Sequence, residues 1–252
     1  MDDKAELFPH RDRIALFLDV DGTLLEFAPL PQAVVAPESL VSCLSRIEGA
    51  LDGALALVSG RSISDLDRIF HPLRLRASGV HGAEFRMDPE APIELQQPSD
   101  GLPDGAKRKL NAIAAEFPGA LLEDKRYSVA MHYRLAPRIA APLREALLAF
   151  NRSEALLDLE LLEGRLVYEL KPRAFNKGSA IRRFMSGPPF AGRRPVFVGD
   201  DTTDAPALDA VEEMQGLGYA VGLAHPKVTE RFAAPANVRR WLEALADGMA
   251  HA

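Results

Sequence analysis

The sequence predicts an α/β protein with a doubly wound, mainly parallel sheet of the Rossmann-like type and a smaller inserted α+β domain. Three observations support this class. Short, continuously apolar segments alternate with longer amphipathic segments toward both ends of the chain, as expected for parallel strands that helices cover on both faces. In the middle of the chain, one helix-like and two strand-like segments occur twice in succession. The length of 252 residues suffices for a large domain and a smaller module.

The first part of the parallel domain is predicted from three apolar segments. Residues 14–20 (IALFLDV) form the first strand, and a helix follows over about residues 38–48. The segment ALALVSG at residues 54–60 is the next strand, with a helix over residues 62–70, and RASGV at residues 76–80 resembles a third strand. This order is typical of strand–helix–strand units.

The same order returns in the last third of the chain. A helix begins near Asn176, and the strand PVFVGD follows at residues 195–200. A further helix begins after Asp204, GYAVG at residues 218–222 is a short strand, and a terminal helix covers about residues 238–249. The two ends of the chain therefore belong to one α/β domain.

The middle segment is predicted to be an insert, residues 102–167, between core segments 1–101 and 168–252. Helix-like AKRKLNAIAAEF precedes strand-like ALLED and YSVAMHYR, and helix-like IAAPLREALLAF precedes LDLEL and RLVYELK. These segments indicate a small antiparallel sheet with two helices, preceded by the turn-rich stretch QQPSDGLPDG. An elaborate edge of a single sheet is the alternative.

Composition excludes several classes of protein. Hydrophobic residues make up 47% and charged residues 26%, which is typical of a globular protein. The net charge of −6 argues against nucleic acid as a partner, because such binding depends on clustered Lys and Arg. The single cysteine, Cys43, excludes an internal disulfide and a cysteine-based zinc site. We expect a cytoplasmic location and no membrane association, since no leader-like or membrane-spanning segment is evident.

Polar residues follow three of the predicted strands. In a parallel sheet the carboxyl ends of the strands meet at one edge, where ligands bind. The residues at these ends are Asp19, Asp21, Gly22 and Thr23 after the first strand, Ser59, Gly60 and Arg61 after the second, and Asp200, Asp201 and Asp204 after the late strand. Up to five carboxylates would repel one another there, so a divalent cation is expected. Oxygen ligands favour Mg²⁺ over zinc.

The same edge suits a phosphate. Backbone N–H groups near Gly22, Thr23, Ser59 and Gly60 can point at an oxyanion. Lys177 lies at the start of a helix, where its ammonium and the positive end of the helix act on the same negative group. Because Mg²⁺ in proteins is commonly shared with substrate phosphates, a phosphorylated ligand is expected.

These motifs resemble those of a known superfamily. DVDGTL, VSGRS, a lysine before a helix, and GDDTTD, in this order, are similar to the four motifs of the haloacid dehalogenase superfamily of phosphohydrolases. The longer segments SGRSISDLDRIF, SGVHGAEFR, DKRYSVAMHYR, YELKPRAFNKGSAI and VFVGDDTTDAPAL resemble the trehalose-6-phosphate phosphatases, in the core and in the insert. One position departs from the family: Ala205 replaces a common Glu, at a place the mechanism does not need.

The resemblance implies a Mg²⁺-dependent phosphatase that acts on trehalose 6-phosphate, the last step of trehalose biosynthesis. Asp19 would attack phosphorus and form an aspartyl phosphate, and Asp21, two residues further on, would serve as acid and then base. Ser59 and Lys177 would stabilise the transferring phosphoryl group. The metal would be held by the Asp19 carboxylate, the Asp21 backbone carbonyl and Asp200, with Asp201 and Asp204 outside them.

The remaining expected contacts concern the sugar and the phosphate. By resemblance, Glu123, Lys125 and Glu169 contact the sugar, as do His132 and Arg134, while Gly22, Thr23, Gly60, Arg61 and Asn176 complete the substrate site. Ser128, His132 and Arg134 alternate with the larger Tyr127, Val129, Met131 and Tyr133, so one face of this strand can be buried while the other is open. His81 is expected to support the site without binding substrate.

Two other interpretations of the function remain open. A sucrose-phosphate phosphatase, another sugar phosphatase or a phosphomutase would use the same core and differ in the insert. A sensing module would be phosphorylated on Asp19, or bind ligand, without turnover, but it would need neither Asp21 nor the full acidic set from Asp200 to Asp204. No motif implies a partner protein.

Overall fold

The structure is a computed structural model that describes residues 13–26, 34–95, 102–125, 128–164, 166–222 and 228–250. The chain divides into two compact units, Met1–Glu94 with Asn176–Ala252, and Leu95–Phe175. The insert predicted over residues 102–167 falls inside the second unit, and residue 101, at its predicted boundary, lies outside the described residues. Within the described part of the chain, no helix is both long and apolar enough to cross a membrane.

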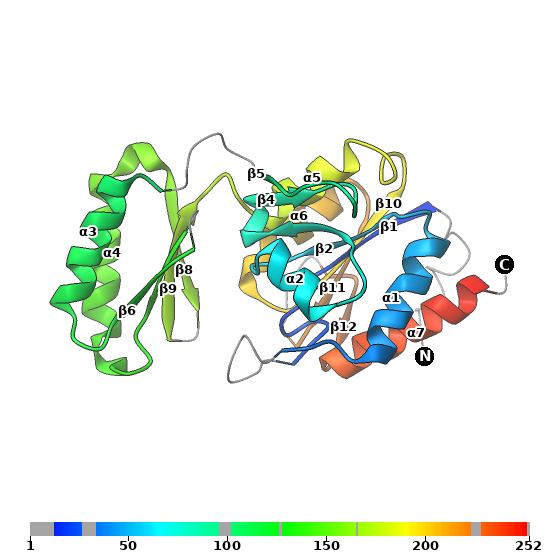
Figure 1. Cartoon of the computed structure of the whole chain (residues 1–252), viewed down its shortest axis with the longest axis horizontal. Helices are drawn as coiled ribbons and strands as arrows, with labels where there is room; N and C mark the ends of the chain where they lie inside the picture. Colours follow the sequence, from blue (N-terminus) through cyan, green and yellow to red (C-terminus); the bar gives the residue numbers. More distant parts are fainter. Residues whose placement is uncertain are drawn as a thin grey trace. The chain divides into compact units, whose positions relative to one another are not determined.

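An eight-stranded sheet forms the centre of the first unit (Figure 1), in the order β12-β11-β10-β1-β2-β3-β4-β5. The pairs from β12 to β3 are parallel, and β4 joins β3 antiparallel. Its strands are β1 (Ile14–Leu18), β2 (Leu55–Val58), β3 (Arg76–Gly79), β4 (Glu84–Arg86), β5 (Glu94–Leu95), β10 (Arg194–Gly199), β11 (Leu217–Val221) and β12 (Glu230–Phe232). Its helices are α1 (Glu38–Ala50), α2 (Ile63–Ile69), η4 (Val80–Gly82), α5 (Lys177–Met185), η7 (Thr202–Asp204), α6 (Ala205–Glu213) and α7 (Pro235–Ala250).

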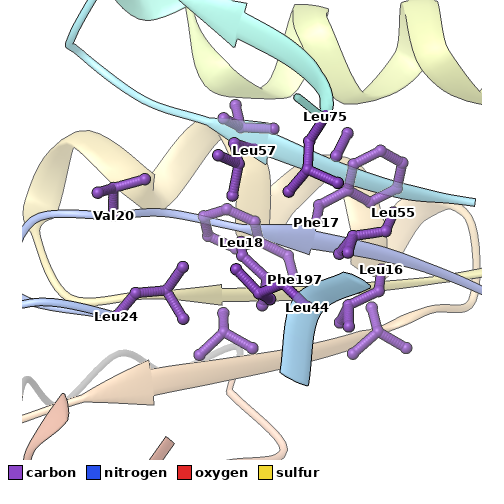
Figure 2. Close-up of a cluster of buried hydrophobic side chains, with 14 of the residues drawn as sticks. Leu16, Phe17, Leu18, Val20, Leu24, Leu44, Leu55, Leu57, Leu75 and Phe197 are labelled. Atoms are coloured by element: carbon purple, nitrogen blue, oxygen red, sulfur yellow. The ribbon is translucent and has the colours of Figure 1, made fainter. Parts of the chain in front are cut away.

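The apolar strands form the centre of the sheet because helices cover both of its faces. All five residues of β1 are buried, although successive side chains point to opposite faces. Figure 2 shows Phe17 and Leu18 of β1 among Leu57 of β2, Phe197 of β10 and Leu44 of α1. In Figure 1 the strands run between the pair α5–α6 and the pair α1–α7. Burial on this scale stabilises the strands by about 1.5–3 kcal/mol for each large side chain.

Side-chain caps set the beginnings of two helices that flank the candidate site. The Ser62 hydroxyl accepts a hydrogen bond from the backbone N–H of Asp65 and caps α2. Asn176 caps α5 in a reciprocal capping box with Ser179. Such caps contribute about 1 kcal/mol each and fix where the first turn of the helix lies.

The second unit is an antiparallel sheet with two helices on one face (Figure 1), in the order β6-β7-β9-β8. Leu110, Leu143 and Leu147 of the helices pack against Val129 and Met131 of the sheet. The elements are α3 (Asp104–Glu116), β6 (Leu121–Asp124), β7 (Val129–His132), η5 (Pro137–Ile139), α4 (Ala140–Ser153), η6 (Ala155–Leu157), β8 (Leu159–Gly164) and β9 (Val167–Pro172). Helix, strand, strand thus occurs twice, as the sequence predicts.

The predicted fold class is confirmed, and the alternative of a single elaborate sheet is wrong because the two sheets are separate. The chain passes from β1 to β2 and β3 on one side, and from β10 to β11 and β12 on the other. The strand order therefore reverses beside β1, which is where open α/β sheets bind their ligands. The sequence pattern does not predict β4, β5 or β12.

Candidate active site

Three adjacent strands bring the predicted residues of the core together. Because β10, β1 and β2 are neighbours in that order, the loops that follow them meet at one edge of the sheet. Asp19 and Asp21 follow β1, Ser59 and its neighbours follow β2, and the acidic loop from Asp200 to Asp204 follows β10. The hydrogen bond from the Asp19 amide to the Val198 carbonyl, at 2.9 Å, continues the β1–β10 pairing into the site.

A buried triad of charges lies at the centre of this edge. The Lys177 ammonium lies 2.7 Å from Asp19 Oδ1 and 2.5 Å from Asp204 Oδ1, and all three side chains are almost fully buried. Burial alone would depress the pKa of Lys177, but the Asp19 and Asp204 carboxylates outweigh it and hold this pKa above its usual range. Lys177 therefore remains a cation inside the protein.

Asp204 organises the acidic loop rather than facing outward. Its Oδ2 accepts hydrogen bonds from the backbone N–H groups of Asp200, at 2.8 Å, and Asp201, at 3.1 Å. Its Oδ1 accepts from Lys177. Both oxygens are therefore engaged by protein donors, and Asp204 fixes the loop that presents Asp200.

The carboxylate oxygens of Asp19, Asp200 and Asp204 could hold a cation. One oxygen from each lies within 4.8 Å of the others. The Thr23 hydroxyl lies 3.4 Å from Asp19 Oδ2 and 3.5 Å from Asp200 Oδ1, so these two oxygens lie near each other. Burial raises the pKa of Asp19 well above its ordinary value. Burial, and then the charge of Asp204, raise the pKa of Asp200 to about 6. Carboxylates in this condition are the ones a bound cation would stabilise most.

Asp21 is held by an arginine from the next strand end. Arg61 donates from Nε and Nη2 to the two carboxylate oxygens of Asp21, at 2.6 and 2.8 Å. Its Nη1 donates to Asp65 Oδ2 at 2.6 Å. Hydrogen bonding to Asp21 raises the pKa of Arg61 above its usual range. The structure thus places Arg61 in the site, where its guanidinium donates hydrogen bonds to the carboxylates of Asp21 and Asp65.

Ser59 and Gly60 lie where the sequence predicts them, after β2. Ser59 is buried, and its hydroxyl accepts the backbone N–H of Arg61 at 3.2 Å. The backbone N–H of His81 donates to the Ser59 carbonyl at 3.0 Å. A Cβ at Gly60 would lie 2.7 Å from the His81 ring, so this close approach requires glycine. His81 therefore packs behind the loop that carries Ser59.

The other core positions lie around the same edge. Thr23 is fully buried beside Asp19. The backbone N–H groups of Gly22, Thr23 and Ser59 donate to the carbonyls of Leu25, Val20 and Ser78, at 2.7, 3.3 and 2.9 Å. The prediction that these three N–H groups point at an oxyanion is therefore wrong, because backbone carbonyls already accept them. The Asn176 side chain caps α5 one residue before Lys177. Its capping role sets the position of the helix that carries the lysine.

The predicted sugar contacts of the second unit lie on one face of its sheet. Across the strands, Glu123 pairs with Ala130 and Ala130 with Glu169, so these side chains form one row. The neighbours of this row, Val129 and Met131, point to the opposite face, into the apolar core with the helices. Glu123, Lys125, His132 and Glu169 therefore share the polar face of this sheet.

A histidine–carboxylate contact and a lysine–carboxylate ion pair organise this polar face. His132 Nε2 lies 2.8 Å from Glu123 Oε2. The Lys125 ammonium lies 3.0 Å from Glu169 Oε2, and the buried Ser128 hydroxyl donates to Glu169 Oε1 at 2.5 Å. Glu169 is held on both oxygens, whereas Arg134 is exposed beyond the end of β7.

Sequence reasoning missed three participants. Ser128 orients Glu169, Asp65 shares Arg61 with Asp21, and Lys171 is buried on β9, where its ammonium contacts Glu160 and the Phe175 carbonyl. The spacing of Arg61 and Asp65, four residues apart at the start of α2, was a visible signal for one of these contacts. The alternation over residues 128–134 placed Ser128 on the open face but did not mark it as a partner of Glu169, and no sequence signal points to Lys171.

An acidic edge with a buried lysine, at the point where a parallel sheet reverses its strand order, is typical of phosphoryl-transfer enzymes that use an aspartate. The fold agrees with this class. A haloacid dehalogenase-like hydrolase from B. subtilis is similar over 91% of this chain and 99% of its own, with a TM-score of 0.63 at 16% identity. The C-terminal domain of the trehalose-6-phosphate phosphatase of C. albicans is similar over 98% and 97%, with a TM-score of 0.81 at 20% identity.

Sequence comparison narrows the class to one family. A family model described as trehalose-phosphatase matches residues 17–237. The trehalose-6-phosphate phosphatase of Escherichia coli (strain K12) is 38% identical over 231 residues, which cover 92% of this chain and 86% of that protein. The chain therefore belongs to the trehalose-phosphatase family and is a phosphoric monoester hydrolase, and its fold is that of the haloacid dehalogenase-like hydrolases. The resemblance inferred from the sequence motifs is confirmed.

Proposed function

We propose that this protein hydrolyses trehalose 6-phosphate to trehalose and inorganic phosphate, through an aspartyl phosphate on Asp19 and with Mg²⁺ as cofactor. The family match supports the substrate. One observation carries the mechanism: Asp19 is buried with one oxygen on the Lys177 ammonium, while its other oxygen lies beside Thr23 and near the Asp200 carboxylate. A nucleophile at the end of β1 is thereby fixed next to groups that suit a phosphate.

The first step forms a bond between Asp19 and phosphorus. The P–O bond to the sugar breaks, and Asp21, which must enter this step in its protonated form, gives its proton to the departing oxygen. In the second step a water loses a proton to Asp21 and attacks phosphorus, which releases phosphate and restores Asp19. Lys177, Ser59 and the backbone N–H group of Gly60 stabilise the charge on the phosphoryl oxygens. The N–H groups of Gly22 and Thr23 take no part, because they donate to the carbonyls of Leu25 and Val20.

The chain has a fitting set of oxygen ligands for Mg²⁺. Three groups would hold the ion directly: the Asp19 carboxylate, the Asp21 backbone carbonyl and the Asp200 carboxylate. Asp201 and Asp204 would lie outside this set of direct ligands. The raised pKa values of Asp19 and Asp200 support this set, because a nearby cation offsets the cost of keeping buried carboxylates ionised. When bound, Mg²⁺ would neutralise charge on the phosphate oxygens.

Selectivity for the sugar is assigned to the polar face of the second sheet. Glu123, Lys125 and Glu169 would bind glucose hydroxyl groups, with His132 and Arg134. Charged donors and acceptors that are held in place recognise hydroxyl groups well, since an analogue that lacks a hydroxyl leaves them unpaired. The paired geometry of Glu169, with Ser128 and Lys125 on its two oxygens, supports such a role.

Release of inorganic phosphate tests the proposal. Trehalose 6-phosphate, sucrose 6-phosphate and glucose 6-phosphate are each supplied with Mg²⁺ or with EDTA, and Asp19→Asn is the matched control because it removes only the charge. We expect release from trehalose 6-phosphate that depends on Mg²⁺ and disappears in the variant. Release from another sugar phosphate alone would contradict the assignment of the polar face, and no release from any would favour a sensing module. Isomerised sugar phosphate without free phosphate would indicate a mutase.

A further inference from the structure

Arg61 is the strongest feature of the site that the reaction above leaves without a role. Among the residues that the structure describes, its guanidinium donates two hydrogen bonds to Asp21 and one to Asp65. Its side chain is only 12% exposed, compared with 27% for Asp21. An arginine that is partly buried and bound on both of its edges is not an ordinary surface ion pair.

The backbone around Arg61 is fixed from several directions. The Arg61 carbonyl accepts the backbone N–H of Val80 at 2.8 Å, and its own N–H donates to the Ser59 hydroxyl. The N–H of Ile63 donates to the Glu84 carboxylate at 2.7 Å. Val80 has a positive φ of 47°, a conformation that costs a β-branched residue energy and persists only when its surroundings hold it. The guanidinium therefore starts from a rigid loop.

The far side of Arg61 is anchored as well. Asp65, in the first turn of α2, accepts Arg61 on Oδ2 and Arg68 on Oδ1, the latter at 2.6 and 3.0 Å. The Asp65 amide is capped by Ser62. A continuous chain of charge-assisted hydrogen bonds thus runs from α2 to the Asp21 carboxylate.

We propose that Arg61 is a positioning residue that acts through Asp21 and does not bind substrate. The two parallel hydrogen bonds fix the plane of the Asp21 carboxylate, which a single point charge could not do. The orientation of this carboxylate decides whether it delivers a proton to the departing oxygen. This inference rests on the proposed role of Asp21 as acid and base, and it replaces the substrate contact expected of Arg61 from the sequence.

The test compares leaving groups that differ in their need for a proton. Benzyl phosphate releases an alkoxide and p-nitrophenyl phosphate releases a stable phenolate, while neither carries a sugar hydroxyl. For Arg61→Gln we expect kcat/KM to fall about 100-fold for benzyl phosphate and trehalose 6-phosphate, and less than about 5-fold for p-nitrophenyl phosphate, because only the first two need the acid. Since kcat/KM reports steps up to departure of the leaving group, later hydrolysis does not obscure the comparison.

Two further variants complete the experiment. Asp65→Asn removes an anchor of Arg61 without touching Asp21, and we expect a smaller loss with the same dependence on the leaving group; it decides the question if Arg61→Gln does not fold. Arg46→Gln removes an exposed arginine–aspartate pair of the same unit, the one with Asp247, and should leave all three rates unchanged.

The outcomes separate this inference from the proposed function. An equal loss for all three substrates, or a loss for trehalose 6-phosphate alone, would overturn the positioning role in favour of a phosphate or a sugar contact. If the unaltered protein hydrolyses benzyl phosphate but not trehalose 6-phosphate, the proposed substrate is wrong, while the benzyl and p-nitrophenyl rates still decide the role of Arg61. If it hydrolyses none of the three, both proposals are wrong.

Discussion

Gly178, next to the buried lysine, offers the sharpest test of how the helices hold the site. It lies in the first turn of α5, where that helix packs against the start of α6. A Cβ at this position would lie 2.1 Å from the backbone carbonyl oxygen of Pro206. An ordinary contact begins at 3.4 Å, so the two backbones would have to separate by about 1.3 Å.

Gly178→Ala is therefore expected to act on both stability and activity. Alanine gains about 1 kcal/mol over glycine in an unstrained helix, but overpacking against backbone typically costs about 1–3 kcal/mol, so a net loss of up to about 2 kcal/mol follows. Lys177, the preceding residue, would shift with the helix, so its contact with Asp19 would be disturbed. A displacement of about 1 Å in a catalytic group lowers turnover by a factor of order 100.

Gly49→Ala is the matched control. Gly49 lies in α1 of the same unit, and nothing lies within 4 Å of a Cβ at that position. This variant should equal or exceed the original protein in stability by up to about 1 kcal/mol and keep full activity. Urea unfolding followed by circular dichroism measures the first quantity, and phosphate release measures the second. If Gly178→Ala were as stable and as active as Gly49→Ala, the packing of α5 against α6 would not position Lys177.

Three further changes probe the charges of the two units. Asp204→Asn removes the carboxylate between Lys177 and the acidic loop, so we expect a loss of about 3–5 kcal/mol in urea unfolding, and a loss below about 1 kcal/mol would contradict its central place. Ser128→Ala removes the hydroxyl that donates to Oε1 of the buried Glu169; the KM for trehalose 6-phosphate should rise while p-nitrophenyl phosphate turnover stays constant, and a loss on both substrates would speak against a sugar contact. Burial raises the pKa of Asp200 to about 6 from an ordinary 3.8, so its contribution favours the folded state below pH 4 and is lost as the pH rises to 6. In metal-free protein, the Tm of Asp200→Asn minus the Tm of the original protein should therefore increase as the pH is raised from 4 to 7. A difference that stays constant over this range would refute the raised pKa of Asp200.

The central strands could be predicted from the sequence because strands that are buried on both faces consist of consecutive apolar residues. Continuous apolar residues in β1, β2 and β10 predicted buried parallel strands, and the polar residues behind each run predicted the site. The strands β4, β5 and β12, at or next to the edges of the sheet, contain only two or three residues each, too few to show a period. They exist because neighbouring strands offer them hydrogen bonds, which is a property of the assembled sheet.

The contacts inside the site could not be predicted in the same way. Arg61 and Asp21 are 40 positions apart, and Ser128 and Glu169 are 41 apart. No local periodicity relates residues at such separations; strand order and register bring them together. The sequence predicts which chemical groups reach the edge of the sheet, whereas their partners depend on the folded backbone. Ser128, just before β7, illustrates the point, because the alternation predicts its face but not that its hydroxyl donates to Glu169.

The charges at the edge of the large sheet give a physical reason for a divalent cation there. Asp19, Asp200 and Asp204 would carry three negative charges when ionised, and the Lys177 ammonium among them offsets one. The negative charge of Asp204 is balanced by Lys177 and by two backbone N–H groups. The negative charge that lacks a balancing positive charge is therefore that of Asp19 and Asp200, the two groups whose pKa values burial raises. A phosphate monoester adds further negative charge at the same place. A doubly charged ion between the two carboxylates would offset their negative charge and that of the substrate together. The proposed metal dependence therefore rests on a balance of charges that Lys177 alone does not complete.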